Sequence, residues 1–203
     1  MNSDTDLKNK VAREAATLLY FGAEKEYKQA KTKAAKTFGV HFLPTNLEVA
    51  LELDKIAEEK EGSARKERLI LMRTEALKIM KHLNAYRPLL IGSVWRGTIR
   101  YGSDIDIAAY ADAPEQVVNI LKANGIKVSR AGWTTVNKQG QTLSSYHIYA
   151  ETTKFTIEVV VRSPEEAGKK RKCEIFGDEI KGLKIQELEK VLKENPTMQF
   201  LPC

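Results

Sequence analysis

The spacing of hydrophobic positions divides the chain into two parts. Up to about residue 83, apolar residues recur every three to four positions, as at Val11, Ala15 and Leu18, which is the spacing of amphipathic helices. Farther along the chain, short apolar runs alternate with turns, as strands do. The pattern therefore predicts a helical N-terminal region (1–85) followed by a mixed domain (86–203).

Turn and capping residues divide the helical region further. Gly39 suits the position that follows a helix C-terminus. Thr45 and Glu48 have the spacing of a capping box at the start of the next helix, and Gly62 precedes a further helix from about 64 to 83. The many charges on these helices fit either a solvated face or an RNA-binding surface.

The second region predicts an α+β fold with an α/β-type core. Its apolar runs are rich in β-branched and aromatic residues, which favour strands. We expect strands at 89–91, 105–110, 126–129, 144–150 and 155–161, and helices at 113–124 and 185–194. Helices first and mixed elements later indicate a catalytic type of core with a helical attachment.

The charge balance favours anionic partners without identifying one. Lys and Arg outnumber Asp and Glu by 33 to 27, which gives a net charge of +6 and a pI near 9.2. Such an excess attracts triphosphates or RNA. A solvated basic surface explains it equally well, and the same holds for the basic run at 169–172.

Cysteine and hydropathy patterns exclude some classes of protein. The two cysteines and three histidines do not cluster, so a zinc site is not expected. No window approaches the ~18 apolar residues of a membrane span, and the N-terminus does not resemble a signal peptide. We therefore expect a cytoplasmic protein with no membrane partner.

A strand that runs directly into Gly92 and Ser93 is the first candidate for chemistry. Glycine lets the backbone approach a ligand closely, and a short helix that starts at Ser93 would offer its N–H groups to a phosphate. Arg96 and Arg100 would add fork-shaped contacts to the same anion. Alone, Gly-Ser also fits an ordinary turn.

Asp104 and Asp106 are the second candidate. Side chains two apart in a strand share a face, and two carboxylates on one face repel each other unless a cation lies between them. Oxygen ligands of this kind suit Mg²⁺. An exposed strand edge explains one Asp-x-Asp, but its position eleven residues after Ser93 makes the combination specific.

The string Gly-Ser-x-x-Arg-Gly-Thr, followed by Gly-Ser-Asp-Ile-Asp-Ile, resembles the signature of the polymerase-beta-like nucleotidyltransferases. It is similar to archaeal CCA-adding enzymes and to small stand-alone nucleotidyltransferases, over roughly residues 88–162. The resemblance implies a nucleotidyltransferase fold, with a small mixed sheet flanked by helices. This length leaves no room for the large domains that measure tRNA in CCA-adding enzymes.

The resemblance also implies a catalytic set. A third carboxylate from a later strand completes a site for two Mg²⁺ or Mn²⁺ ions in this superfamily, and Glu158 is the candidate, although Asp is usual there. Asp104, Asp106 and Glu158 would then be both the catalytic residues and the metal ligands. Without the resemblance, Glu158 also fits a cross-strand salt bridge.

The same resemblance implies that an NTP is bound by residues around this set. These nucleotide-binding residues would be Gly92, Ser93, Arg96, Ser103 and His147. A structural role for His147 fits as well. Trp133 is expected in the core, whereas Trp95 fits either the core or a base-stacking position.

The implied reaction transfers a nucleoside monophosphate from an NTP to an acceptor hydroxyl and releases pyrophosphate. The acceptor would be RNA, or a protein side chain if the enzyme modifies proteins with AMP. A nucleotide-binding regulator of the same fold is a further alternative, which three intact carboxylates disfavour. Neither the base of the NTP nor the oligomeric state can be read from the sequence.

Overall fold

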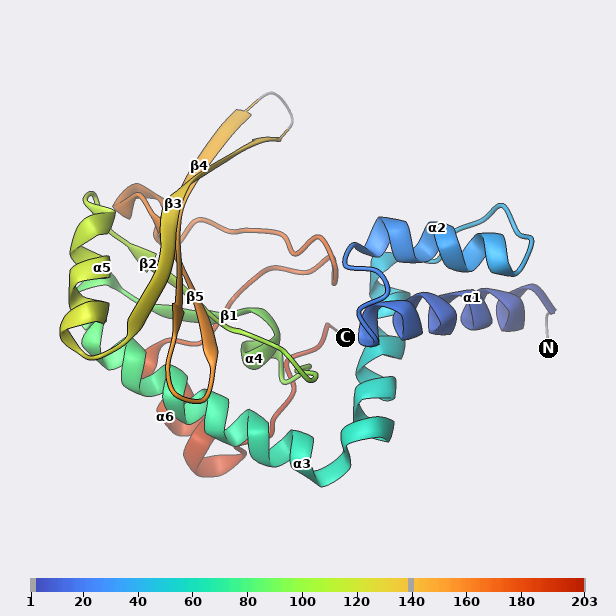
Figure 1. Ribbon diagram of the computed structural model, residues 1–203, viewed down its shortest axis with the longest axis horizontal. Helices are drawn as coiled ribbons and strands as arrows, with labels where there is room; N and C mark the ends of the chain where they lie inside the picture. The colour runs from blue at the N-terminus through green and yellow to red at the C-terminus, as the bar shows by residue number, and fades with distance from the viewer. Residues whose placement is uncertain (1–2, 139–140, 203) are drawn as a thin grey trace. The chain divides into compact units, whose positions relative to one another are not determined.

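The computed structural model describes residues 3–138 and 141–202 (Figure 1). They form two compact units, one with the residues up to Arg65 and Lys172–Glu179, the other with Lys66–Arg171 and Ile180–Phe200. The hydrophobic pattern predicts the boundary between the two regions at residue 85. In the structure the division lies earlier, because the second half of one long helix buries its apolar side chains in the core of the sheet unit.

The first unit is built on closely packed helices. α1 (Ser3–Tyr20) packs against α2 (Tyr27–Thr37), and the first half of α3 (Asn46–His82) belongs to the same unit. The shared core consists largely of small side chains: Val11, Ala12, Ala15, Ala16, Leu19, Ala30, Ala34, Ala35, Val49 and Ile56. Alanine at the contact positions lets helix backbones approach each other.

The start and the corner of α3 follow from side chains near them. The Thr45 N–H donates to Glu48 Oε2 (2.7 Å) and the Glu48 N–H donates to Thr45 Oγ1 (3.1 Å), which confirms the predicted capping box. At Gly62 the backbone leaves the helical region (φ 52°, ψ −134°). Buried Arg65 forms ion pairs with Asp54 and Glu58, and these stabilise the corner.

In the described part of the second unit, five strands form one mixed sheet. They are β1 (Leu89–Ile91), β2 (Ile105–Tyr110), β3 (Lys127–Lys138), β4 (Gln141–Glu151) and β5 (Thr156–Arg162), in the order β1-β2-β5-β4-β3. Only β2 and β5 are parallel among these pairings. The α+β class and the mixed sheet flanked by helices are thus confirmed.

The helices of this unit lie close to their predicted positions. They are α4 (Gly92–Arg96), α5 (Pro114–Ala123) and α6 (Ile185–Glu194), with 3₁₀ turns at Asn84–Tyr86 and Pro164–Glu166. α5 ends before Gly125, whose φ of 74° suits a helix stop. The predictions for 113–124 and 185–194 are confirmed within a residue.

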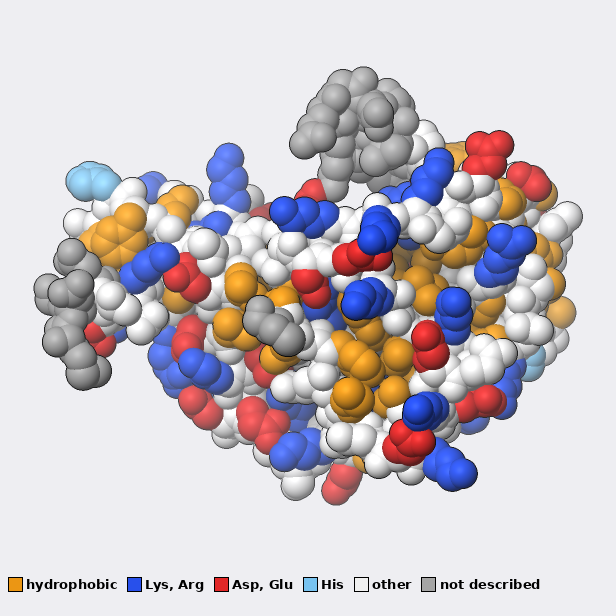
Figure 2. All heavy atoms as spheres, turned by 180° about the vertical axis from the view of Figure 1, so that it is seen from behind, with side chains coloured by type: hydrophobic (Ala, Val, Ile, Leu, Met, Phe, Trp, Pro, Cys, Tyr) orange, Lys and Arg blue, Asp and Glu red, His pale blue; other side chains and the backbone are white. Residues whose placement is uncertain are grey.

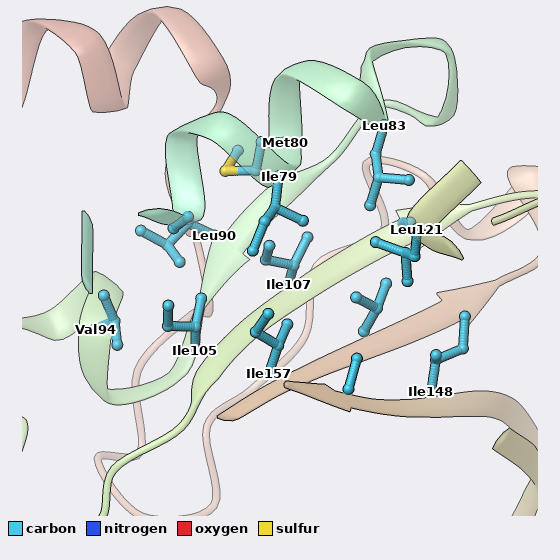
Figure 3. Close-up of a cluster of buried hydrophobic side chains, with 14 of the residues drawn as sticks. Ile79, Met80, Leu83, Leu90, Val94, Ile105, Ile107, Leu121, Ile148 and Ile157 are labelled. Atoms are coloured by element: carbon cyan, nitrogen blue, oxygen red, sulfur yellow. The ribbon is translucent and has the colours of Figure 1, made fainter. Parts of the chain in front are cut away.

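Alternation along the strands separates a core face from an open face. Ile105 and Ile107 of β2 and Ile157 of β5 pack with Ile79 of α3 and with Leu83, the residue after α3 (Figure 3). Side chains between them on the strands must point to the opposite face. The positions of Asp106 and Glu158 are of that kind, so the core dictates that both carboxylates face away from the helices.

The β3–β4 hairpin is longer than predicted. The sequence predicts that the first strand ends at residue 129 and that the next begins at 144. In the structure β3 continues to Lys138 and β4 begins at Gln141. Trp133 was expected in the core. That prediction is wrong, because Trp133 is 63% exposed and makes an edge contact with Tyr146.

Basic and acidic side chains are interspersed over the face drawn in Figure 2. Within residues 3–138 and 141–202, no helix combines the length and the apolar character that crossing a membrane requires.

Candidate active site

Gly92 and Asp106 are in direct contact. Ile91, the last residue of β1, pairs with Asp106, so the chain turns into α4 directly beside this carboxylate. Gly92 has a φ of 69°, and a Cβ added to it would lie 2.0 Å from Asp106 Oδ2. Only glycine fits here, both for its backbone conformation and for its lack of a side chain.

One row of paired residues crosses the sheet at this level. Asp106 pairs with Glu158, Glu158 pairs with Tyr149, and Tyr149 pairs with Arg130. Paired residues in adjacent strands project to the same face. The row therefore presents two carboxylates, a phenol and a guanidinium next to one another on the open face.

Asp104 adds a third carboxylate just before β2 begins. Its Oδ1 accepts a hydrogen bond from Thr156 Oγ1 at 2.5 Å, and Thr156 lies two residues before Glu158 on the same strand. Asp104 is exposed, whereas Asp106 and Glu158 are half-buried. All three predicted metal ligands are thus brought to the same end of β2 and β5.

The environment of Asp106 disfavours the charged form of its carboxyl group. Burial, followed by the charges of Glu158 and Asp104, raises the pKa of Asp106 to about 7. Desolvation and like charges both oppose ionisation of a carboxyl group. At neutral pH the site therefore holds more negative charge than its surroundings stabilise.

His147 contacts Glu158 through one nitrogen of its ring. Its Nδ1–H donates to Glu158 Oε1 (2.6 Å), and its Nε2 lies 2.8 Å from Ser145 Oγ. Since a histidine held at both nitrogens has a fixed orientation, Ser145 and His147 fix the position of Glu158. The sequence predicts either a nucleotide-binding or a structural role for His147. In the structure its ring contacts the third carboxylate, Glu158.

Tyr149, two residues after His147 on β4, pairs directly with Glu158. Burial, followed by the charge of Glu158, raises the pKa of Tyr149, while Arg130 lowers it. The Arg130 guanidinium lies 4.3 Å from the centre of the Tyr149 ring, a cation–π contact. Sequence reasoning missed both residues, although alternation along 144–150 puts Tyr149 on the face of His147.

Ser103 closes the turn that leads into the Asp-x-Asp strand. Its Oγ accepts from the Arg100 N–H (2.9 Å), and its own N–H donates to the Arg100 carbonyl (3.0 Å). The predicted nucleotide-binding residue therefore shapes the backbone immediately before Asp104. Gly102, with a φ of 77°, is part of the same turn.

The structure places Ser93 and Arg96 differently. Ser93 is half-buried next to Gly92, and its carbonyl accepts from the Thr98 N–H (3.0 Å). Arg96 is buried, stacks over Trp95, and donates from Nη1 to the Phe200 carbonyl (3.0 Å). Arg96 thus contacts the C-terminal segment, and Trp95 is in the core.

The carboxylates fit a divalent cation by their chemistry. Asp106 is a half-buried oxygen donor whose ionisation is opposed by two neighbouring carboxylates, a conflict that a cation removes. Among the described residues, no group of three His, Cys, Asp or Glu side chains already has the geometry of a metal site. Asp104 and Glu158 instead accept hydrogen bonds from Thr156 and His147.

Comparisons with known proteins give partial structural likenesses only. No protein-family model matches the chain, and no curated protein matches it. A structure of a cytoplasmic RNA terminal U-transferase is similar over 58% of this chain and 34% of its own, with 17% identity and a TM-score of 0.29. The structure of a GLD-2/RNP-8 complex is similar over 60% and 40%, with 12% identity and a TM-score of 0.33.

This chain thus spans well under half the length of either matched chain.

Proposed function

We propose that the protein transfers a nucleoside monophosphate from an NTP to an acceptor hydroxyl and releases pyrophosphate. The contact between Gly92 and Asp106 carries the proposal. It brings an approachable backbone turn, suited to a triphosphate, next to a carboxylate that pairs with Glu158. Substrate phosphates and carboxylates would then meet at one point.

The roles follow from the positions of the side chains. Asp104, Asp106 and Glu158 would hold two Mg²⁺ or Mn²⁺ ions, which supply charge neutralisation and a more acidic hydroxyl when bound. The backbone at Gly92 and Ser93 would orient the triphosphate. Ser103 shapes the turn before Asp104, His147 orients Glu158, and Arg96 supports the loop from behind rather than contacting the NTP.

The first unit supports a polyanionic acceptor such as RNA. α2 carries Lys28, Lys31, Lys33 and Lys36 and has no acidic residue within its bounds. Lys33 pairs with Glu24, which lies before the helix, at 3.0 Å. Arg13 of α1 likewise pairs with Glu52 and Glu59. A helix with one sign of charge attracts phosphates, and its affinity falls as salt rises.

Incubation with each α-labelled NTP and Mg²⁺ or Mn²⁺, together with total RNA and a protein lysate, tests the proposal. We expect label on RNA. Label on protein would identify a protein-modifying enzyme instead. Metal-dependent NTP binding without transfer would support a regulator, and the absence of NTP binding would overturn the site altogether.

Two conservative changes, one at the site and one outside it, provide a matched comparison. The double variant Asp104→Asn, Asp106→Asn removes two charges from the site, whereas Asp112→Asn removes one from an exposed position shortly after β2. Transfer should vanish in the first and persist in the second. Equal transfer in the two would show that the carboxylates do not carry the activity.

A further inference from the structure

Residues 196–200, which we name the C-terminal strap, hold α4 from the side that does not face Asp106. Arg73 of α3 links the two. Its guanidinium donates to the Pro196 carbonyl (2.7 Å) and the Met198 carbonyl (2.8 Å) of the strap. The same group donates to the carbonyls of Val94 (3.1 Å) and Trp95 (2.9 Å) in α4.

This guanidinium donates to main-chain carbonyls through all three of its nitrogens. Arg73 is fully buried, and four carbonyl oxygens accept from it. The fixed fork of the guanidinium matches such a set, which the single ammonium of a lysine cannot reproduce. α4 and the strap therefore share one donor group and cannot shift independently without losing its hydrogen bonds.

The strap also contacts α4 directly. The Phe200 N–H donates to the Arg96 carbonyl (2.9 Å), and the Phe200 ring stacks on Trp95 with 6.4 Å between ring centres. Gln199 Nε2 donates to the Gly97 carbonyl (3.3 Å). A Cβ on Gly97 would lie 2.9 Å from the Met198 carbonyl, so glycine is needed for this close approach.

α4 has only five residues, and its own hydrogen bonds cannot fix its position. Its first residue, Gly92, must keep its contact with Asp106, while its last residues are bonded to Arg73 and the strap. A displacement of the strap would therefore be transmitted through a single helical turn to the backbone that faces the carboxylates.

We propose that Arg73 and the C-terminal strap are the positioning device of the triphosphate-binding turn at Gly92 and Ser93. This inference rests on the proposed function for its ligand, an NTP. Arg73 and Phe200 touch no substrate in this arrangement; they act by holding α4. Loosening the strap weakens NTP binding and leaves the acceptor site unaffected.

Phe200→Ala is the principal test, because it removes the ring but leaves the backbone hydrogen bonds of the strap. Leu192→Ala is the matched control, since Leu192 is also half-buried against the same core but belongs to α6 and not to the strap. We expect the KM for NTP to rise about tenfold in Phe200→Ala, with the KM for the acceptor unchanged. In Leu192→Ala both constants should stay within twofold of the wild type.

Arg73→Lys and Arg73→Met give a second, graded comparison. Lysine restores a positive donor but not the fork, so its KM for NTP should lie between those of the wild type and Arg73→Met. If Arg73→Met does not fold, Arg73→Lys and Phe200→Ala still decide. An NTP KM in Phe200→Ala within twofold of the wild type would overturn the inference.

Hydrogen exchange separates this inference from the proposed function, because it needs no nucleotide. The N–H groups of Gly97 and Thr98, which donate to the Ser93 carbonyl, should exchange at least tenfold faster in Phe200→Ala than in Leu192→Ala. Equal exchange would overturn the hold of the strap on α4. Faster exchange in a protein whose wild type binds no NTP would overturn the proposed function alone.

Discussion

Two ionisable side chains, the buried Arg73 and the half-buried Asp106, contact the same short helix and differ in how their charge is stabilised. Arg73 of α3 contacts the end of α4 and donates to four carbonyls. Desolvation lowers the pKa of Arg73 only to about 10, so the side chain stays charged. Asp106, at the first residue of α4, faces two further carboxylates, and its pKa rises to about 7. A buried charge with its partners in place holds a structure together. A buried charge without them marks a place where a ligand is needed.

Asp106→Asn tests the functional side of this comparison and should have the largest effect. It keeps the shape of the side chain and removes the charge that a cation would bind. We expect transfer to fall about 1,000-fold, which corresponds to several kcal/mol of lost transition-state stabilisation. Labelled-NTP turnover measures it, with Asp112→Asn as the control. Activity within threefold of the wild type would show that Asp106 is not part of the machinery.

Gly92→Ala should have the next largest effect. The new Cβ would overlap the Asp106 carboxylate, so the turn and the carboxylate would have to separate. We expect a loss of activity of about 10- to 100-fold, because misplacement by about 1 Å costs that much in a positioned site. Gly125→Ala is the matched control, with a similar φ of 74° but no atom within 4 Å of its Cβ. Equal losses in both would attribute the effect to backbone strain alone.

Arg73→Met tests how much the hydrogen bonds of Arg73 contribute to stability. Four carbonyl groups would lose a shared donor in a buried position, which we expect to lower the free energy of unfolding by about 3 kcal/mol. Urea denaturation measures the change. Lys78→Met, an exposed change on the same helix, should alter stability by less than about 0.5 kcal/mol. Similar values for the two variants would contradict the structural role of Arg73.

The pH dependence of stability should show the smallest effect. The pKa of Asp106 is raised in the folded protein, so the folded state binds a proton more tightly than the unfolded state does. Its contribution is therefore fully present below about pH 4 and is lost as pH rises to about 7. A rise of about three pKa units corresponds to about 4 kcal/mol. Because Asp106 is half-buried and solvent screens part of the effect, we expect a loss of about 2 kcal/mol in EDTA.

Thermal unfolding of the wild type and Asp106→Asn at several pH values measures this contribution. The difference between the two proteins should grow from pH 4 to pH 7 in EDTA and shrink when Mg²⁺ is added. A difference that is constant with pH would mean that the carboxyl group keeps an ordinary pKa in the folded protein.

Local patterns predicted the parts of the molecule that local forces determine. The capping box of Thr45 and Glu48 involves residues three apart. Strand alternation alone predicts that Asp106 shares a face with Asp104 and that Ile105 points into the core. These expectations needed no knowledge of distant contacts. The candidate carboxylates were therefore accessible from the sequence, and the structure brings them together at one end of β2 and β5.

Contacts between distant segments could not be predicted in this way. Arg96 is predicted to bind a phosphate beside Ser93, and the structure adds a hydrogen bond from Arg96 to the carbonyl of Phe200, more than a hundred residues farther along the chain. Arg73 lay unnoticed in a charged helical segment. Trp133 is predicted in the core by its apolar character, whereas it lies in the long β3–β4 hairpin with 63% of its surface exposed.

The parallel pairing of β2 with β5 determines the order in which the site can form. Antiparallel neighbours such as β3–β4 and β4–β5 are close in the chain and can pair early, whereas a parallel pair requires a long crossover. We therefore expect Asp106 to meet Glu158 late in folding, after α5 and the hairpin have formed. Any state that lacks this pairing would also lack the proposed cation site, so Mg²⁺ should slow unfolding without accelerating the early phase of refolding.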